Sequence, residues 1–455
     1  MKGNKELFEQ MPVAKALATL AVPTIISQLI TIIYNLADTF FVGRTNDPFK
    51  VAAATISFLF LFMTTALANL FGIGGGSLIS RLLGEKKPEE AKRVCALSFY
   101  GAVLISAIYV FVMSVYMEPI LRLAGASDNT IVYAKDYIFW AIIIGGIPTT
   151  VSLTVAHLLR SEGFARDASI GLGMGGISNI ILDPIFMFYI LPKGQEVAGA
   201  AIATMVSNMI SCIYLLIVFL KRTKTTCMSV SIKNAVAGLK YTLKIFSVGF
   251  PSTISTLLSC ISNSVINNLI SGYGDIPMAA MGIVKKIDMI PLSISMGICQ
   301  GMLPLVAYNY ASGNYKRMRA FSNCAILWGI LFAGFCILIF ELFTGHIVRL
   351  FIEEEETLAL GTSFLSIACL ATPLMITNVQ MNYTFQAMGK GPQTLLLASC
   401  RQGLINIPLL FIMNSIFGLY GIICTQIIAD GITMIISFSM YLSIYKQLKA
   451  KQNDS

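Results

Sequence analysis

The sequence predicts an all-α integral membrane protein of twelve transmembrane helices, arranged as two pseudo-symmetric six-helix bundles. Three observations predict this fold class. The mean hydropathy is +0.76 and only 12% of the residues are charged, about half the share of an average soluble domain. Long runs contain no charge at all. The two halves of the chain also repeat short motifs in the same order.

The uncharged runs are long enough to cross a membrane. Residues 96–117 and 325–340 carry no charge, and a bilayer core needs about 20 apolar residues per helix. Hydropathy and the positions of Gly and Pro predict twelve spans. The first six lie near 15–42, 52–80, 94–117, 134–160, 168–191 and 197–221, and the second six near 243–271, 278–310, 320–343, 360–387, 394–416 and 419–445.

The first apolar segment is predicted to be a retained span. Residues 16–42 lack a small-residue cleavage site, are too long for a signal-peptide core and contain Asp38.

The basic residues predict the orientation. If the N-terminus is cytoplasmic, 24 of the 32 Lys and Arg residues fall on the inside, a count that includes Arg401. This bias satisfies the positive-inside rule. We therefore expect a multi-pass protein of a bacterial cytoplasmic membrane with both termini cytoplasmic. The basic loops then orient the chain, and no nucleic-acid partner is expected.

The ten cysteines lie singly, without a CxxC pair. They predict neither a zinc site nor a disulfide framework. No nucleophile–base set is evident either, so an enzyme is not expected, and no Walker lysine motif suggests direct use of ATP.

The halves are related by an offset of 224 to 229 residues. Residues 22–27 match 250–255, and Asp183-Pro184 corresponds to Ile407-Pro408. Six spans in each half give both repeats the same topology, with an axis along the membrane normal. We predict a first lobe at 1–225, a cytoplasmic link at 226–242 that lets the lobes rock, and a second lobe at 243–455.

Acidic residues deep in apolar sequence are the first candidates for function. Asp38, Asp183 and Asp430 lie deep, and Asp288 lies at intermediate depth. A charge at the bilayer centre costs roughly 3 kcal/mol on insertion scales, so each needs a reason to be there. Such a carboxylate either joins helices by hydrogen bonds or binds an ion.

Polar neighbours favour ion binding at two of them. Asp38 ends a helical stripe that includes Tyr34, and Asp183 has Asn179 one turn earlier and a proline directly after it. The next span carries Thr204. These oxygens suit a proton or a small hard cation such as sodium, and the residues do not decide between the two.

The second half offers weaker candidates for a cleft or gate. Lys285 and Asp288, at i and i+3, can form a structural ion pair or serve the cleft. Asn263 and Asn378 keep the seventh and tenth spans polar without charge. Asp430 is interpreted as structural.

Three motifs resemble those of the multidrug and toxic compound extrusion (MATE) transporters. They are Tyr-Asn-Leu-Ala-Asp-Thr-Phe-Phe-Val-Gly over residues 34–43, Asn-Ile-Ile-Leu-Asp-Pro over 179–184 and Gly-Ala-Ala-Ile-Ala-Thr over 199–204. The absence of acids from the seventh and tenth spans is more similar to the DinF-like and MepA-like branches than to the NorM-like one.

The resemblance implies a monomeric efflux antiporter surrounded by membrane lipid. It would export small cationic drugs and dyes in exchange for protons or sodium ions. The resemblance makes Asp38, Asn179, Asp183 and Thr204 the first-lobe cation site, the one place where a metal ion is expected, with Tyr34 and Tyr137 as neighbours. No other cofactor is implied.

A lipid-linked precursor flippase of the same broader superfamily is the alternative. Such chains usually line the cleft with basic residues and have more spans, whereas the deep first-lobe charges here are acidic and favour cationic cargo.

Overall fold

The computed structural model describes residues 6–45, 47–352 and 354–453, and within these ranges the chain forms helices and no strands. The first lobe contains α2 (Val13–Gly43), α3 (Pro48–Gly84), α4 (Pro88–Leu123), α5 (Ile131–Ile138), η2 (Phe139–Ile144), α6 (Gly146–Ser161), α7 (Ala165–Pro184), η3 (Ile185–Ile190) and α8 (Glu196–Arg222). The second contains α10 (Thr242–Ser271), α11 (Asp275–Ala311), α12 (Tyr315–Arg349), α13 (Glu355–Ala387), α14 (Gly391–Ser399), η5 (Cys400–Leu404) and α15 (Asn406–Asn453). The segments η1 (Glu6–Gln10), α9 (Ile232–Gly238) and η4 (Leu239–Tyr241) lie outside the spans.

The helices account for twelve spans. Ten apolar stretches are long enough to cross a membrane, and Ile131–Ile144 with Gly146–Ser161 forms an eleventh span, bent by 50°. The helix α15 is broken at Gly418, which has φ 58° and ψ −139°. At 1.5 Å per residue its 48 residues would reach about 72 Å, more than twice a bilayer core. The part before Gly418 therefore completes the eleventh span and the rest is the twelfth, which confirms the predicted fold.

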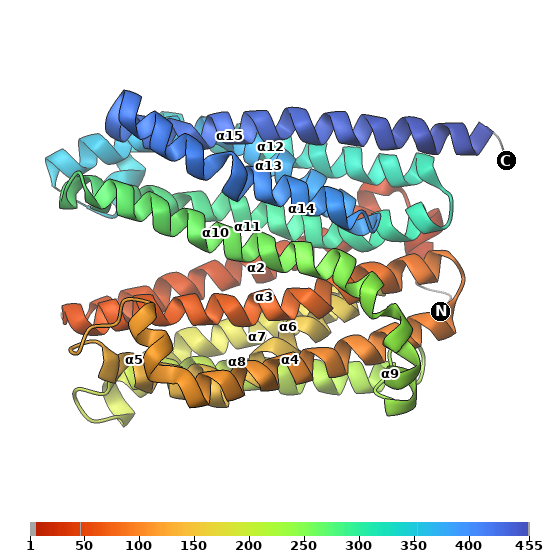
Figure 1. Cartoon of the computed structure of the whole chain (residues 1–455), viewed down its shortest axis with the longest axis horizontal. Coiled ribbons are helices and arrows are strands. Elements are labelled where there is room, and N and C mark those ends of the chain that lie inside the picture. Colours follow the sequence, from red (N-terminus) through yellow and green to blue (C-terminus); the bar gives the residue numbers. More distant parts are fainter. Residues whose placement is uncertain (1–5, 46, 353, 454–455) are drawn as a thin grey trace.

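The two lobes lie side by side (Figure 1). The helices α2 and α3 of the first lobe face α10 and α11 of the second, with extensive contact between α3 and α10 and between α2 and α11. The first described residues and the end of α15 lie at the same end of the molecule. We call this the termini end, and the other the far end.

Glycines let the lobes pack backbone to backbone. A Cβ added to Gly249 of α10 would lie 1.9 Å from the carbonyl oxygen of Leu70 in α3, and one added to Gly301 of α11 would lie 2.6 Å from Ala21 of α2. Hydrogen bonds cross the same seam, for example from the Ser77 hydroxyl to the Gln386 carbonyl oxygen at 2.6 Å. Small residues serve close helix packing here, as is usual in membranes.

The N-terminal segment joins the lobes at the termini end. Leu7 and Phe8 of η1 are buried. The Phe8 ring stacks on Tyr308 of α11 at 4.8 Å between centroids, and Arg317 of α12 donates to the Phe8 carbonyl oxygen at 2.8 Å. Leu7 packs against Gly163, after α6. Contacts with both lobes therefore hold this segment.

The link between the lobes is docked on the first one. The helix α9 and η4 pack along α4: the Tyr241 hydroxyl donates to Glu90 at 2.6 Å and the Tyr100 hydroxyl donates to the Val230 carbonyl oxygen at 2.8 Å. Gly238 lies against the Arg93 carbonyl oxygen. The segment predicted as a link that lets the lobes rock is thus an ordered part of the first-lobe surface.

Candidate cation site

The two first-lobe aspartates are buried together. Asp38 lies one and a half turns before the end of α2 and is 3% exposed, and Asp183 lies near the end of α7 and is 0% exposed. The two carboxylates interact electrostatically. Because α2 and α7 pack along each other, residues 145 positions apart in sequence meet in one polar centre.

Asn179 connects this centre to α8. Its side-chain amide donates to Asp183 Oδ1 at 3.1 Å and to Thr204 Oγ1 at 3.4 Å. Asn179 and Asp183 are one turn apart and so lie on the same face of α7. The structure therefore brings together the four residues that the sequence predicts as a cation site, although their role stays a prediction.

Several acceptors in the centre lack a donor. Among the described residues, Asp38 Oδ1, Asp183 Oδ2 and the Asn179 side-chain oxygen are buried and have no hydrogen-bond partner. None of the ion pairs in this part of the chain involves either aspartate. Buried acceptors normally have partners. A group of carboxylate and amide oxygens without a basic side chain has the donor chemistry for a proton or a hard cation.

Both predicted tyrosine neighbours are present. Tyr34, one turn before Asp38 on α2, and Tyr137 of α5 each interact electrostatically with Asp38 and Asp183. Tyr137 is completely buried and interacts with Thr204. The fourth span therefore contributes to the centre as well.

The proline after Asp183 changes the helix. Pro184 lacks an N–H, and the span continues as the π-helix η3. Gly199 of α8 admits the backbone of Met187 there, since a Cβ at Gly199 would lie 2.8 Å from the Met187 Cα. Single π turns inside helices are frequent at functional sites, and this one follows directly after the aspartate.

The second-lobe candidates do not form one site. Lys285 donates to Asn267 of α10 at 2.6 Å, whereas Asp288 interacts with Cys336 and Cys369 on α12 and α13. Among the ion pairs of the described ranges none joins Lys285 to Asp288, so the structure does not contain the ion pair that was one of the two alternatives, and a role in the cleft or gate stays a prediction. Although only two residues separate them, the two side chains interact with different neighbouring helices.

Asn263 and Asn378 differ in exposure and in their hydrogen-bond partners. Asn263 is exposed and donates to the Ser259 carbonyl oxygen of its own helix at 2.9 Å. Asn378 is buried and donates to Asp430, to the carbonyl oxygen at 2.8 Å and to Oδ1 at 3.2 Å. Asn378 thus belongs to a polar centre inside the second lobe.

Sequence reasoning missed the cation of that centre. Arg401 Nε donates to Asp430 Oδ1 at 2.6 Å. Counting Arg401 with the inside residues was wrong, because it lies in η5, ten residues past the start of α14. That is about 15 Å along the helix, half of a bilayer core. Its position within a predicted span was the available signal.

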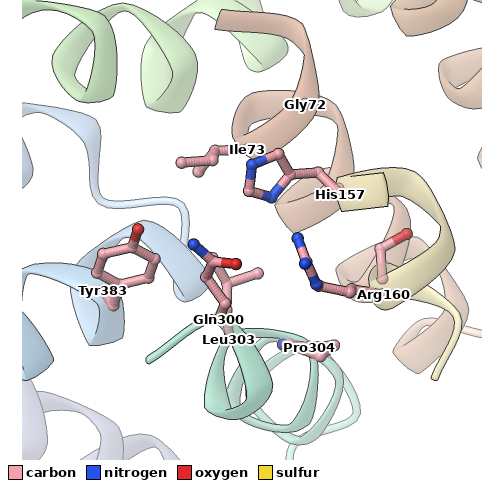
Figure 2. Close-up of a pocket in the computed structure, with 10 residues that line it drawn as sticks. Gly72, Ile73, His157, Arg160, Gln300, Leu303, Pro304 and Tyr383 are labelled. Atoms are coloured by element: carbon pink, nitrogen blue, oxygen red, sulfur yellow. The ribbon is translucent and has the colours of Figure 1, made fainter. Parts of the chain in front are cut away.

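The seam between the lobes is closed at the termini end. Figure 2 shows His157 and Arg160 of the first lobe opposite Gln300 and Tyr383 of the second. The space among them has a volume of about 10 Å³, close to the smallest cavity that holds one water molecule. The seam around these residues therefore has room for no more than about one water molecule.

Toward the far end a much larger open cavity lies against α10 of the second lobe, with Leu59 as its first-lobe lining residue. Its volume is about 560 Å³, and it lies between Leu59 of α3 and residues 257–269 of α10, with Phe411 of α15 at its edge. The lining is mostly apolar, with Ser264 and Asn268 as polar groups. This size and lining are typical of sites for small organic molecules.

Comparisons with known proteins agree with this architecture. The MatE family model matches residues 23–185 and again residues 251–412. The chain is 30% identical to the multidrug export protein MepA of Staphylococcus saprophyticus and to that of Staphylococcus aureus strain MRSA252, in each case over 93% of this chain and 92% of the relative.

Solved structures show the same fold. A crystal structure of a MATE transporter in complex with MaL6 has a TM-score of 0.92 at 23% identity, covering 99% of this chain and 100% of that one. The outward-facing conformation of a multidrug resistance MATE family transporter has a TM-score of 0.91 at 23% identity, covering 99% of both chains. The family model covers most of the sequence in two copies and the MepA relatives cover nearly all of it, so this chain belongs to the MATE family.

Proposed function

We propose that this protein is an antiporter that exports small organic cations and takes up protons or sodium ions in exchange. The observation that carries the proposal is the first-lobe centre, in which two buried carboxylates lie together without a basic side chain. Uncompensated buried charge is costly in a membrane. A cation or a proton from solution removes that cost, which makes ion binding favourable there.

The family relationship supports an export function. The relatives at 30% identity are multidrug export proteins. The large apolar cavity along α10 supports bulky and mostly apolar cargo, and the acidic character of the first-lobe centre favours cargo with a positive charge.

The proposed cycle alternates between two lobe arrangements. In the observed one the seam is closed at the termini end and a large cavity lies toward the far end. With the termini in the cytoplasm, which the basic loops predict, this arrangement would face outward. Cargo would leave it as the ion enters the first lobe, and each inward positive charge supplies about 2.3 kcal/mol per 100 mV.

Two aspartate variants test the proposal. Asp38→Asn and Asp183→Asn keep the shape of each side chain but remove its charge. We expect both to abolish ion-driven dye efflux from proteoliposomes, with normal yield and a normal elution profile of the purified protein. Asn129→Asp, at an exposed position between α4 and α5, is a control for altered charge elsewhere.

Separate gradients identify the coupling ion. A dye such as ethidium is loaded into proteoliposomes, and a proton gradient or a sodium gradient is imposed in turn at zero membrane potential. Efflux that follows one gradient identifies the ion. Full efflux by Asp38→Asn or Asp183→Asn under that gradient would falsify the coupling role, and failure of the wild type to move dye under either gradient would remove the antiport proposal.

A further inference from the structure

The second lobe contains a buried ionic centre of its own. Asp430 of α15 is 0% exposed, and both oxygens of its carboxylate are bonded. Oδ1 accepts from Arg401 Nε at 2.6 Å and from Asn378 at 3.2 Å, and Oδ2 accepts from Gln426 at 2.8 Å. Asn406 supports Gln426 with a further hydrogen bond at 3.0 Å.

This centre occupies the same pair of spans in its repeat as the first-lobe centre does. The two family-model matches begin 228 residues apart and end 227 residues apart. The match of Asp183-Pro184 with Ile407-Pro408 puts Arg401 in the fifth span of the second lobe, as Asn179 and Asp183 are in the fifth span of the first. Asp430 lies in the sixth span of its lobe, as Thr204 does in the first. Both centres therefore lie where the fifth and sixth spans of a lobe meet, and each fifth span has a π-helical turn, η3 or η5.

The two centres differ in how their charge is balanced. In the first lobe, Asp38 Oδ1 and Asp183 Oδ2 have no partner among the described residues. In the second lobe, Asp430 has three side-chain donors, one of which belongs to a guanidinium whose side chain is 15% exposed. An arginine stays protonated at any physiological pH, so this lobe carries its counter-ion permanently.

We propose that Arg401 is a tethered cation, which takes in the second lobe the place that the exchangeable ion takes in the first lobe. The inference rests on the proposed antiport function. The Asp430 centre then takes no part in ion exchange and stays electrically neutral throughout the cycle. Gln426, Asn406 and Asn378 hold the carboxylate in the orientation that the guanidinium needs.

An ion pair that only stabilises the fold would behave differently on substitution. Removing one partner of a buried pair is strongly destabilising in either case. Only a tethered cation predicts that the carboxylate left behind acquires affinity for a proton or a sodium ion from solution. The test must therefore measure ion binding as well as stability.

The first experiment measures ion-linked stability in an Asp38→Asn/Asp183→Asn background, in which the first-lobe charges are absent. The melting temperature of the purified protein is recorded over a series of sodium concentrations and of pH values. When Arg401→Gln is added to this background, the melting temperature is expected to rise by roughly 2 °C for each tenfold increase in sodium or proton concentration, relative to the Asp38→Asn/Asp183→Asn parent. Arg401→Gln/Asp430→Asn should match the parent. Equal ion dependence in all three proteins would overturn the proposal.

The second experiment measures stoichiometry and does not depend on the yield of Arg401→Gln. The double variant Arg401→Gln/Asp430→Asn, with wild-type first lobe, removes both charges of this centre and leaves no uncompensated charge in it. In proteoliposomes, the ratio of dye concentrations across the membrane at zero net flux is plotted against the imposed ratio of ion concentrations across the membrane, on logarithmic axes. We expect the slope, the number of ions per dye molecule, to equal that of the wild type. A lower slope would show that the second lobe takes part in ion exchange.

The results separate the two proposals. A zero slope in the wild type would refute antiport itself, whatever the behaviour of Arg401. A positive wild-type slope together with a reduced slope in the double variant would refute only the tethered-cation proposal.

Discussion

Asn179 donates from one side-chain amide to both Asp183, at 3.1 Å, and Thr204, at 3.4 Å. The nitrogen of the Asn179 amide thus orients Asp183 relative to α8. The oxygen of the same amide has no partner among the described residues, so it adds a free hydrogen-bond acceptor to the centre. Asn179 therefore has two separable contributions, one to geometry and one to the number of oxygens.

Asn179→Ala removes both contributions. We expect the ion concentration that gives half-maximal efflux to rise roughly tenfold to a hundredfold, the range seen when a partner that orients an ion ligand is lost. Efflux at saturating ion should be much less affected, because both carboxylates remain. The measurement is initial dye efflux over a range of ion concentrations.

Asn129→Ala is the matched control, because Asn129 is exposed and lies between α4 and α5, away from the first-lobe centre. If both alanine variants had the same half-maximal ion concentration as the wild type, Asn179 would have no part in ion binding.

Gly249 tests the close contact between the lobes. A Cβ there would lie 1.9 Å from the Leu70 carbonyl oxygen, so Gly249→Val is expected to force α10 away from α3. This strain exists only while the seam is closed at the termini end. We therefore expect a shift toward the arrangement that is open at that end.

Spin labels on the first and second lobes measure this shift. Lys87, directly before α4, and Lys316, near the start of α12, are exposed at the termini end of the two lobes. Cysteines introduced there in a background without the ten native cysteines accept the labels. Gly249→Val should shift the distribution of label–label distances to longer values. Gly334→Val, where a Cβ would meet nothing within 4 Å, should not, and equal distributions in the two variants would contradict the strain argument.

Phe8 provides a second way to weaken the closed seam. Its ring is 2% exposed and stacks on Tyr308, so Phe8→Ala leaves a gap between the lobes. A Phe→Ala substitution in a packed core typically costs about 3–5 kcal/mol of stability. We expect a lower melting temperature together with a longer Lys87–Lys316 label distance.

Phe335→Ala is the control for the loss of an aromatic ring alone. Phe335 is 57% exposed, so its removal leaves the contact between Phe8 and Tyr308 intact. A fall in melting temperature for Phe8→Ala without any change in label distance would mean that η1 stabilises the fold but has no influence on the lobe arrangement.

The sequence was sufficient to locate the first-lobe centre because its members are unusual within their own helices. Asp38 and Asp183 interrupt apolar spans, and Asn179 lies one turn from Asp183. Helical periodicity alone then predicts a shared polar face. The meeting of α2 and α7 was not implied by periodicity and came from the family resemblance.

The features that sequence reasoning missed depend on contacts between segments that are far apart in the chain. Arg401 and Asp430 are 29 residues apart on either side of the break at Gly418, and no local pattern shows that one compensates the other. The burial of Phe8 is similar, because it depends on Tyr308 and Arg317 from a different lobe. Local sequence reports which residues need partners, whereas the packing of the helices decides which partners they receive.

Glu162, which directly follows α6 outside the spans, predicts a pH dependence of stability. It is 2% exposed, and burial raises the pKa of its carboxyl from 4.5 to about 7, against the opposing effect of hydrogen bonds from Cys227 and Thr226. The folded protein thus holds this proton more tightly than the unfolded chain does. The contribution of Glu162 to stability is complete below about pH 4.5 and is lost as the pH rises to about 7.

Glu162→Gln keeps the neutral form at every pH. We therefore expect the difference in melting temperature between pH 5 and pH 8 to be smaller in Glu162→Gln than in the wild type, chiefly because the variant is more stable at pH 8. Glu356→Gln, at an exposed position, should retain the wild-type difference. If Glu162→Gln were instead less stable than the wild type at pH 8, the ionised carboxylate would be favourable in its surroundings, and burial would not dominate at this position.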